Sequence, residues 1–414
     1  MNGVEEKCRN SLKAFSVLKN ASSPEKNYAI FKIGESLILN LDEILKANEE
    51  DVSIARKKGI KESLVDRLRL TKERIITMAK SCDQVMDRED PIGKIDYVKK
   101  LENGLSISRV RIPIGPIGMI YESRPNVTVD AAILCIKSGN TVVLRGGSDA
   151  YMSNNVIVSC IKKALEQTAI PADSVEYLSG KDRSSVNELM KMKDYISLII
   201  PRGGYELIKF VKENSSVPVL ETGVGNCHIF VDETADLHKS VEVILNAKTQ
   251  RPGTCNSVET VLIHEKIAGT FLPMIYKALK ESNVEIYGCE KTIRIIDVSK
   301  ATEDDWQREY LDFKLAVKVV ENISEAISHI DKYSTGHSES ILTNNLENSI
   351  LFKEKVDSAA VYVNASTRFT DGDQFGFGAE IGISTQRIVA RGPVGLDGLT
   401  TYKYVVEGNY NIRG

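Results

Sequence analysis

The sequence predicts an α/β protein made of two doubly wound α/β domains. From residue 117 onward, short apolar stretches alternate with longer segments of helical periodicity. Strands separated by helices of this length form parallel sheets. A second series of the same kind begins after residue 224, and a chain of 414 residues is long enough for two or three domains.

Composition and charge exclude several classes of protein. Hydrophobic residues make up 42% of the chain and charged residues 27%, which is typical of a globular protein. The 54 basic and 57 acidic residues give a formal net charge of −3, so we expect no nucleic-acid or anionic-membrane surface. The N-terminus lacks an apolar signal segment and no run of about 18 apolar residues occurs, which predicts a soluble cytoplasmic protein.

The cysteines and histidines argue against disulfides and metals. The seven cysteines are scattered, with an odd count and no CxxC pair, as expected in a reducing compartment. The five histidines show no zinc-ligand spacing with these cysteines, so we expect no metal site.

The first ninety residues carry a helical pattern that we interpret as scaffold. Ser23-Pro24-Glu25 is typical of a helix start, with proline in the first turn. Apolar residues at intervals of three and four predict one buried helix face after it, and a second helix is expected from Lys61 to Met86. The residues expected to point inward are Ile30, Ile33, Leu37, Leu41 and Leu45, followed by Leu64, Leu68, Ile75 and Met78.

Residues 117–220 are expected to form the first parallel sheet, with ligands binding beyond the carboxyl ends of its strands. The predicted strands are Ile117 to Tyr121, Thr141 to Leu144, Val175 to Leu178, Ser197 to Ile200 and Val217 to Leu220. The predicted helices are Thr128 to Lys137, Ala150 to Thr168, Ser184 to Lys191 and Tyr205 to Lys212.

The second α/β unit is expected to follow Val224 without a linker. Its predicted strands are Cys227 to Val231, Val258 to Ile263, Phe313 to Val320, Ser340 to Leu342 and Ala360 to Val363. Its predicted helices are Ser240 to Ala247, Lys266 to Ser282, Ser324 to Tyr333 and Leu346 to Lys355.

A thiol and a carboxylate lie on two tight turns that can face one cleft. Glu221 precedes the glycine-rich turn from Thr222 to Asn226, and Cys255 follows Gly253 among polar neighbours. A thiolate in a polar pocket is a nucleophile, whereas a cysteine among aliphatic side chains is inert. The alternatives are a cysteine that fills space and a carboxylate that caps the glycine turn.

Two glycine pairs stand at predicted strand ends ahead of helices. One is Gly146-Gly147, between Arg145 and Ser148, and the other is Gly203-Gly204, after Arg202. Backbone N–H groups and helix N-termini at such positions hold phosphate. Although the standard GxGxxG motif is absent, the pairs together indicate a dinucleotide site.

The pairing of Leu220-Glu221-Thr222-Gly223 with a downstream cysteine turn resembles the aldehyde dehydrogenase superfamily. The stretches ETGVGNCHIFVD, NAKTQRPGTCNSVETVL and FGFGAEIGISTQ are similar to one branch of it, the gamma-glutamyl phosphate reductases, also called phosphorylating glutamate-5-semialdehyde dehydrogenases. The resemblance covers about residues 5–412. It implies NADPH-dependent reduction of L-glutamyl 5-phosphate to glutamate 5-semialdehyde and phosphate through a cysteine thioester, the second step of proline biosynthesis from glutamate.

The resemblance also implies a domain division and a β-hairpin arm used for oligomerisation. We expect a dinucleotide-binding domain at 1–104 and 113–224, a catalytic domain at 225–371, and an arm at 105–112 plus 395–414. The alternative for the arm is an ordinary edge hairpin, although a partner subunit would remove an exposed edge. A homo-oligomer and a transient complex with glutamate 5-kinase are the expected partners.

Residue roles follow from the same resemblance. Cys255 is the nucleophile and Asn126 donates to the oxyanion, with a helix N-cap as the alternative for Asn126. Glu221 matches the general base, and here it could act on the thiol, contact the substrate amino group or be a remnant. Arg145 and Ser148 replace a lysine and an acid that favours NAD, which implies NADPH held with Gly146, Gly203 and Gly204. Asp312 falls where the superfamily has a glutamate that holds the nicotinamide ribose.

The charges of the substrate suggest further contacts. Its phosphate and α-carboxylate require arginines, for which we choose Arg251 and Arg368, and its ammonium requires an acid, Asp371 or Asp373. The glycine run from Phe375 to Gly382 permits close backbone approach at the site entrance.

Three other functions remain open at this stage. A hydrolytic semialdehyde dehydrogenase would use water as the acyl acceptor, a related enzyme would use coenzyme A, and a non-catalytic homologue would keep only the fold. The absence of an acid at Ser148 argues against the first, and the joint presence of Asn126, Glu221 and Cys255 argues against the last.

Overall fold

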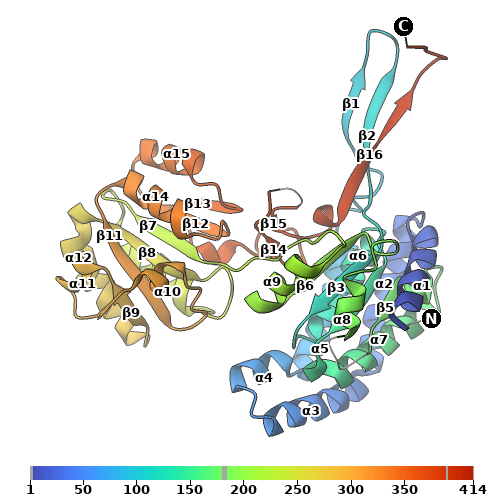
Figure 1. Ribbon diagram of the computed structural model, residues 1–414, viewed down its shortest axis with the longest axis horizontal. Coiled ribbons are helices and arrows are strands. Elements are labelled where there is room, and N and C mark those ends of the chain that lie inside the picture. The colour runs from blue at the N-terminus through green and yellow to red at the C-terminus, as the bar shows by residue number, and fades with distance from the viewer. Residues whose placement is uncertain (1–2, 180–183, 388–389, 414) are drawn as a thin grey trace.

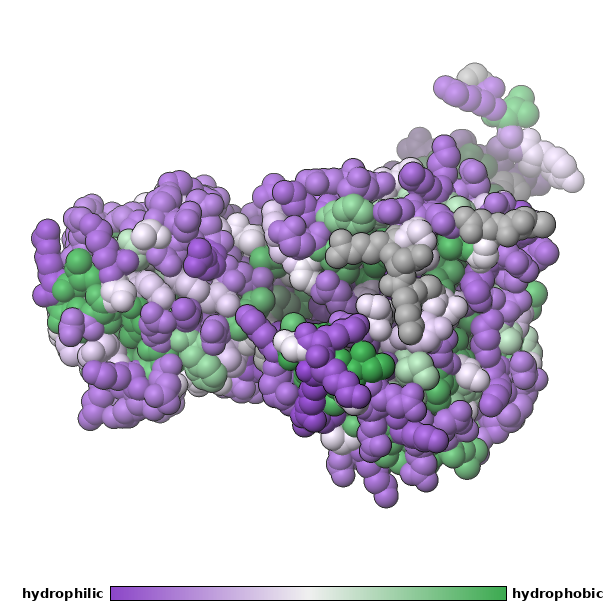
Figure 2. Space-filling view, turned by 60° about the horizontal axis from the view of Figure 1, so that its bottom comes forward, coloured by the Kyte–Doolittle hydropathy of each residue, from purple (hydrophilic) through white to green (hydrophobic). Residues whose placement is uncertain are grey.

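Two α/β lobes and a projecting arm make up the computed structural model, which describes residues 3–179, 184–387 and 390–413 (Figure 1). Residues 1–2 and 414, which the expected domains include, lie outside these ranges. No helix within these ranges is both long and apolar enough to cross a membrane. Hydrophilic residues cover most of the face in Figure 2, and this face is hollowed where the two lobes meet.

Five helices precede the first strand and pack on one lobe (Figure 1). The apolar series from Ile30 to Leu45 is divided between two of them, because α2 ends at Leu39 and α3 begins at Leu41. The predicted start at Ser23 is confirmed, with Ser22 and Glu25 forming a capping box. The helices are α1 Gly3–Leu18, α2 Ser23–Leu39, α3 Leu41–Lys57, α4 Glu62–Leu68 and α5 Lys72–Met86.

The prediction of a single helix from Lys61 to Met86 is wrong, since the helix is interrupted between α4 and α5. The Asn48 side chain donates to Leu68 O at 2.9 Å and accepts from Leu70 N at 2.7 Å, so it takes up backbone groups that a continuous helix would pair. Thr71 then caps α5. Leu64 is 41% exposed and not inward, whereas Leu68, Ile75 and Met78 are buried as expected.

The sheet of the first lobe has four parallel strands in the order β5-β4-β3-β6. Helices α2, α5, α6 and α7 share one hydrophobic core with it, and α1, α8 and α9 share the core on its other face, so it is doubly wound. The expected fifth strand at Val217 to Leu220 is reduced to a parallel bridge between Val219 and Ile199. The elements are β3 Ile117–Tyr121, α6 Asn126–Lys137, β4 Val142–Gly146, α7 Tyr151–Leu165, β5 Val175–Tyr177, α8 Ser184–Leu189, β6 Leu198–Arg202 and α9 Tyr205–Asn214, with short 3-10 helices η1 Ser148–Ala150 and η2 Ala172–Ser174.

The second lobe contains a seven-stranded parallel sheet in the order β10-β9-β11-β8-β7-β12-β13. Ile229 and Val231 of β7 pack toward α10 and α11, and Phe230 packs toward α14 and α15, which confirms the doubly wound prediction. Strands β9 and β10 and helices α12 and α13 were not expected. The elements are β7 Cys227–Val231, α10 Leu237–Thr249, β8 Val258–His264, α11 Glu265–Glu281, β9 Glu285–Gly288, α12 Glu290–Ile293, β10 Ser299–Lys300, α13 Glu303–Gln307, β11 Lys314–Val320, α14 Ile323–Tyr333, β12 Ser338–Leu342, α15 Leu346–Lys355, β13 Ala360–Val363 and η3 Thr367–Phe369.

The arm is an antiparallel sheet of β1 Ile95–Lys100, β2 Ser106–Pro113 and β16 Thr400–Glu407, which extends away from both lobes (Figure 1). The expected boundary at residue 104 leaves β1 outside the arm, whereas its pairing with β2 places it inside. Between the second lobe and the arm, the chain forms β14 Ile383–Ser384, β15 Gly392–Pro393 and η4 Asp397–Leu399.

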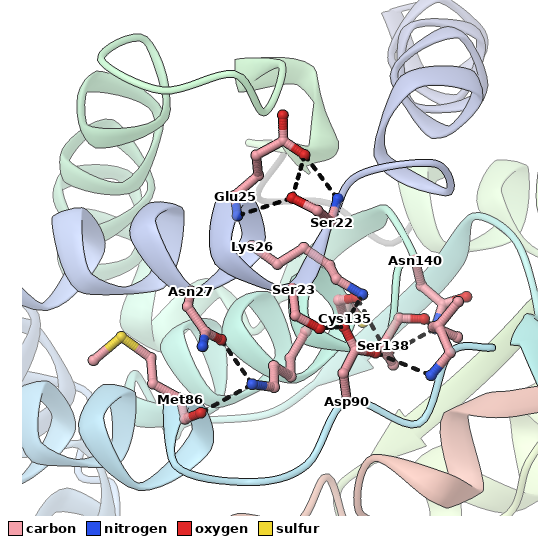
Figure 3. Close-up of polar contacts among 12 residues, drawn as sticks. Ser22, Ser23, Glu25, Lys26, Asn27, Met86, Asp90, Cys135, Ser138 and Asn140 are labelled. Atoms are coloured by element: carbon pink, nitrogen blue, oxygen red, sulfur yellow. Dashed lines mark hydrogen bonds and ion pairs between the residues drawn. The ribbon is translucent and has the colours of Figure 1, made fainter. Parts of the chain in front are cut away.

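A buried polar network ties the base of the arm to the helical layer (Figure 3). Asp90, shortly before β1, pairs with Lys26 and accepts from Ser23 Oγ at 2.5 Å. Lys137 donates to Asn27 Oδ1 at 2.7 Å and to Met86 O at 2.9 Å. Burial acts to raise the pKa of Asp90, but Lys26 and Ser23 outweigh it and lower that pKa overall. The network therefore holds α2, α5, α6 and the start of the arm together.

Candidate active site

Four loops meet at the amino edge of the seven-stranded sheet. Strands β11, β8, β7 and β12 are adjacent and parallel, so the loops that precede them lie side by side. These loops carry Glu309, Cys255, Gly225 and His337, respectively. This edge belongs to the second lobe. The glycine pairs belong to the first lobe, which precedes it in the chain, and they stand at the carboxyl ends of β4 and β6.

The turn of Cys255 is fixed by a very close backbone contact. A Cβ on Gly225 would lie 1.4 Å from Cys255 O, so only glycine fits there. Cys227 Sγ donates to the same carbonyl at 3.1 Å. The Cys255 N–H has no acceptor among the described residues, and it is therefore available to an oxyanion.

The electrostatic surroundings of Cys255 are mixed. Burial raises the pKa of its thiol to about 11, with Glu309 and Glu380 acting in the same direction. Arg202 and Arg124 lower it. A thiol with a pKa of about 11 is mostly protonated at neutral pH.

Asn256, next to Cys255, anchors the cysteine turn to the loop after β13. Its amide donates to Thr370 O at 2.9 Å, and its Oδ1 accepts from Thr254 Oγ1 at 2.9 Å. Arg368 also donates to Asn256 Oδ1, and to Thr254 Oγ1 at 2.9 Å. The predicted substrate residue Arg368 thus lies directly against the cysteine turn.

Arg368 and Asp371 line one polar pocket of about 210 Å³ beside this turn. Burial and then Arg251 lower the pKa of Arg368, while Asp371 and Cys255 oppose this. Three of the residues chosen by charge therefore lie near one another. The pocket is lined by Asn246, Gln250, Arg368, Phe369, Asp371 and Gln374.

Glu221 makes its side-chain contacts with Lys212 and Gln386. Its carboxylate pairs with Lys212 at 3.0 Å and accepts from Gln386 Nε2 at 3.0 Å. The carboxylates with the largest effects on Cys255 are Glu309 and Glu380 instead. The alternative role as a cap of the glycine turn is wrong, because Gly223 N–H donates to Ile383 O at 2.7 Å and Gly225 N–H to Glu309 at 2.7 Å. The catalytic role of Glu221 stays a prediction.

Asn126 is the first residue of α6 and is exposed. Pro125 occupies the N-cap position and no side chain caps this helix, so the N-cap alternative for Asn126 is wrong. Its amide donates one hydrogen to Asp130 Oδ2 at 3.0 Å and keeps a second donor. Burial raises the pKa of Asp130 to about 6.

Gly203 and Gly204 lie against the side chain of Glu122, and Gly147 of the other pair lies against its backbone. Gly204 N–H donates to Glu122 Oε2 at 2.8 Å, and a Cβ on Gly203 would lie 2.6 Å from this oxygen. A Cβ on Gly147 would lie 3.4 Å from Glu122 Cα. The Gly204 amide can therefore bind an anionic oxygen, and a dinucleotide phosphate would have to take the place of the Glu122 carboxylate there.

Arg145 and Ser148, the predicted cofactor residues on either side of the first glycine pair, have different surroundings. Arg145 is only 5% exposed and donates to Ser185 Oγ at 2.8 Å and to Gly146 O. A guanidinium in this position cannot meet a 2′-phosphate without changing rotamer, so that role stays a prediction. Ser148 begins η1 directly after the first glycine pair.

Glu309, which was not expected in the site, contacts the glycine turn, whereas the role predicted for Asp312 stays a prediction. Asp312 is exposed and accepts from its neighbour Phe313 N–H at 2.8 Å. Glu309 binds the Gly225 amide and acts on the thiol of Cys255. Sequence reasoning missed Glu309, and only the adjacency of β8 and β11 could have revealed it.

Comparisons with known proteins agree with this arrangement. Residues 2–292 match the model of the aldehyde dehydrogenase family. The chain is 62% identical over 414 residues to gamma-glutamyl phosphate reductase of Thermotoga sp. (strain RQ2), covering 100% of both proteins.

Solved structures are similar over the same length. The crystal structure of gamma-glutamyl phosphate reductase from Thermotoga maritima has a TM-score of 0.98 at 61% identity and covers 100% of both chains. The enzyme of the same name from Saccharomyces cerevisiae has a TM-score of 0.57 at 30% identity, covering 100% of this chain and 99% of that one. The chain therefore belongs to the aldehyde dehydrogenase family and, within it, to the gamma-glutamyl phosphate reductases.

Proposed function

We propose that this protein reduces L-glutamyl 5-phosphate to L-glutamate 5-semialdehyde and phosphate, the second step of proline biosynthesis from glutamate, with NADPH. The observation that carries the proposal is Cys255 on a turn whose own N–H is unpaired among the described residues, in a chain with full-length reductase relatives. A thiol and an open amide on one residue supply both the nucleophile and an oxyanion donor.

The chemistry at Cys255 proceeds in two stages. The thiolate attacks the acyl carbon, a C–S bond forms, and phosphate leaves with the electrons of the broken C–O bond. The reduced nicotinamide, when bound, supplies the hydride that converts the thioester to a thiohemiacetal. This adduct releases the aldehyde as the C–S bond breaks and the thiolate is restored. The Cys255 N–H and the second amide hydrogen of Asn126 donate to the oxyanion.

The first lobe supplies the residues for the cofactor. Gly146, Gly203 and Gly204 allow the backbone to approach its phosphates, and Gly204 N–H is already oriented toward an anionic oxygen. The preference for NADPH rests on Ser148, which places no carboxylate at that position, together with a rotamer change of Arg145.

The polar pocket beside the cysteine turn suits the amino-acid end of the substrate. Arg368 provides a cation for the α-carboxylate, and Asp371 provides an acid for the ammonium. Asp373 N–H donates to Asp371 Oδ1 at 3.0 Å, so Asp373 supports Asp371 through its backbone.

The arm suits association with a second copy of this chain. Exposed apolar residues on its strands include Tyr97, Val98, Tyr404 and Val406, which a partner would cover. All seven cysteines are free, which supports a reducing compartment such as the cytoplasm. A transient complex with glutamate 5-kinase would deliver the labile acyl phosphate, and failure to show channelling would count against it.

The reverse reaction tests the function, because the acyl phosphate is labile. Glutamate 5-semialdehyde and NADP are supplied with and without inorganic phosphate, and the absorbance of the reduced cofactor is followed. Phosphate-dependent formation that disappears in Cys255→Ala is expected. Equal rates without phosphate would identify a hydrolytic dehydrogenase, a function that the pairing of Glu221 with Lys212 and Gln386 disfavours.

A further inference from the structure

Resting on this proposed function, we propose that Arg67, Arg124 and Arg202, together with Arg251, bind the phosphoryl group of the substrate and the phosphate that leaves. The four residues come from four separate segments: α4, the loop after β3, the end of β6 and the cysteine turn. From the sequence, Arg251 is expected to meet an anionic group of the substrate, and Arg202 stands beside a glycine pair of the expected dinucleotide site. No such role is expected for Arg67 or Arg124, and α4 is expected to be scaffold.

Arg67 brings the N-terminal helical layer into the site. Its Nη2 donates to Gly253 O at 3.3 Å, two residues before the nucleophile. A Cβ on Gly253 would lie 3.4 Å from the same nitrogen, at van der Waals distance, so the guanidinium lies directly against the turn. A hydrogen bond to a single carbonyl uses one of five N–H donors and leaves the others for a ligand.

Arg124 and Arg202 stand at the carboxyl ends of two adjacent parallel strands, β3 and β6. Arg124 is half-buried in the loop that leads into α6, and Arg202 is the last residue of β6, next to β3 in the sheet. Arg202 Nη1 lies 3.3 Å from the position of a Cβ on Gly382, so another segment packs against it closely. Neither guanidinium, nor that of Arg251, makes an ion pair or hydrogen bond with any described residue.

These like charges lie close enough to disfavour one another. The pKa of Arg124 is lowered to about 10, and burial is the largest cause. The positive charges of Arg202, Arg67 and Arg251 also lower this pKa, whereas Cys255 raises it. Glu309 and Glu380 act on the same thiol, and burial raises the pKa of Glu380 to about 7 in spite of Arg202. Arg202 also acts on Asp130. The four cations thus outnumber these three acids, and an anionic ligand would relieve the repulsion.

The chemistry of phosphate matches this group of cations. Guanidinium groups bind phosphate oxygens through paired, charge-assisted hydrogen bonds, and the N-terminus of the 12-residue α6 adds N–H groups beside Arg124. In the forward reaction the cluster stabilises phosphate as it leaves the acyl carbon. In reverse, a phosphate oxygen attacks the thioester carbon, a C–O bond forms, the C–S bond breaks, and the thiolate of Cys255 leaves.

The reverse assay with glutamate 5-semialdehyde and NADP provides the test. Arg67→Ala and Arg124→Ala should each raise the KM for inorganic phosphate by about tenfold or more, as expected for loss of a charge-assisted hydrogen bond. The KM values for NADP and semialdehyde should change by less than about twofold. Arg69→Ala is the matched control, because Arg69 follows the same helix and pairs with Glu62 at 2.9 Å.

Binding without turnover gives a second readout. Inorganic phosphate alone should raise the thermal midpoint of the wild type and of Arg69→Ala, and this increase should shrink in Arg124→Ala. The conservative Arg67→Lys variant should recover part of the phosphate affinity, since it restores the charge without the paired geometry.

The possible outcomes separate this site from the proposed function. A wild type whose rate is independent of phosphate would overturn the proposed function itself. Saturation by phosphate in the wild type, with an unchanged KM for phosphate in the arginine variants, would overturn only the site. A parallel rise in the KM for NADP would assign the cluster to the cofactor phosphates and also overturn it.

Discussion

At the residue scale, the nucleophile depends on groups from distant parts of the chain. Cys255 receives the effects of Arg124 and Arg202 from the first lobe and of Glu309 and Glu380 from later segments. No local feature of the Pro252-Gly253-Thr254-Cys255 turn supplies these charges. The reactivity of the thiol is therefore a property of the assembled site.

The thiol should titrate well above neutral pH. Because the pKa of Cys255 is raised to about 11, its thiolate fraction and its rate of alkylation should rise about tenfold per pH unit between pH 7 and pH 9. Iodoacetamide labelling followed by peptide mass spectrometry measures this, with Cys255→Ala as the blank. A plateau near pH 7 would show that the thiol is already ionised in the free protein.

Gly225, which lies against the carbonyl oxygen of Cys255, should tolerate no side chain. In Gly225→Ala the new Cβ would overlap Cys255 O, so kcat/KM should fall by about 100-fold or more as the cysteine turn is displaced. Gly269→Ala in α11 is the matched control, because nothing lies within 4 Å of its Cβ. That control should keep its activity and gain about 0.5–1 kcal/mol of stability. Normal kinetics in Gly225→Ala would contradict the fixed geometry.

At the scale of elements, the buried network of Figure 3 joins helices to the arm. Lys26 is 1% exposed and pairs with Asp90, so Lys26→Met leaves a buried carboxylate without its partner. We expect the free energy of unfolding to fall by about 3 kcal/mol, measured by urea denaturation. The double variant with Asp90→Asn should lose less, because no unpaired charge remains.

The same pair predicts a pH dependence of stability. The pKa of Asp90 is lower in the folded state, so its contribution is present above the unfolded pKa of about 4 and is lost as pH falls through the folded value. The difference in unfolding free energy between wild type and Asp90→Asn should therefore shrink on acidification. A difference that grows toward low pH would contradict this sign.

At the scale of the whole molecule, two lobes provide different halves of one site and the arm extends beyond both (Figure 1). The seven-stranded sheet presents Cys255, and the four-stranded sheet presents the glycine pairs at its carboxyl edge. Neither lobe holds both Cys255 and the glycine pairs, so we expect activity to require the two lobes together.

The apolar surface of the arm predicts association. Tyr404 and Val406 are 58% and 54% exposed on β16. Replacing both with glutamate should reduce the molar mass measured by light scattering to that of a single chain, because burying unpaired carboxylates in an interface is costly. Lys403→Glu is a control on the same strand. A wild type that is already monomeric would overturn the role of the arm.

The sequence by itself determined the local structure and the chemistry that short motifs encode. Alternating apolar strands and helices specified both doubly wound sheets, because side-chain periodicity follows local backbone geometry. The Ser23-Pro24-Glu25 stretch predicted where α2 begins, and the turn at Cys255 indicated this thiol as the nucleophile.

Only the tertiary structure decided which distant groups share the site. Neighbouring parallel strands brought Glu309 to Cys255 and left Asp312 exposed, and the packing of α4 brought Arg67 to Gly253. The Asn48 side chain broke the expected long helix from 20 residues away. Contacts of this kind depend on strand order and helix packing, which no local periodicity encodes, and so they became visible only in the folded chain.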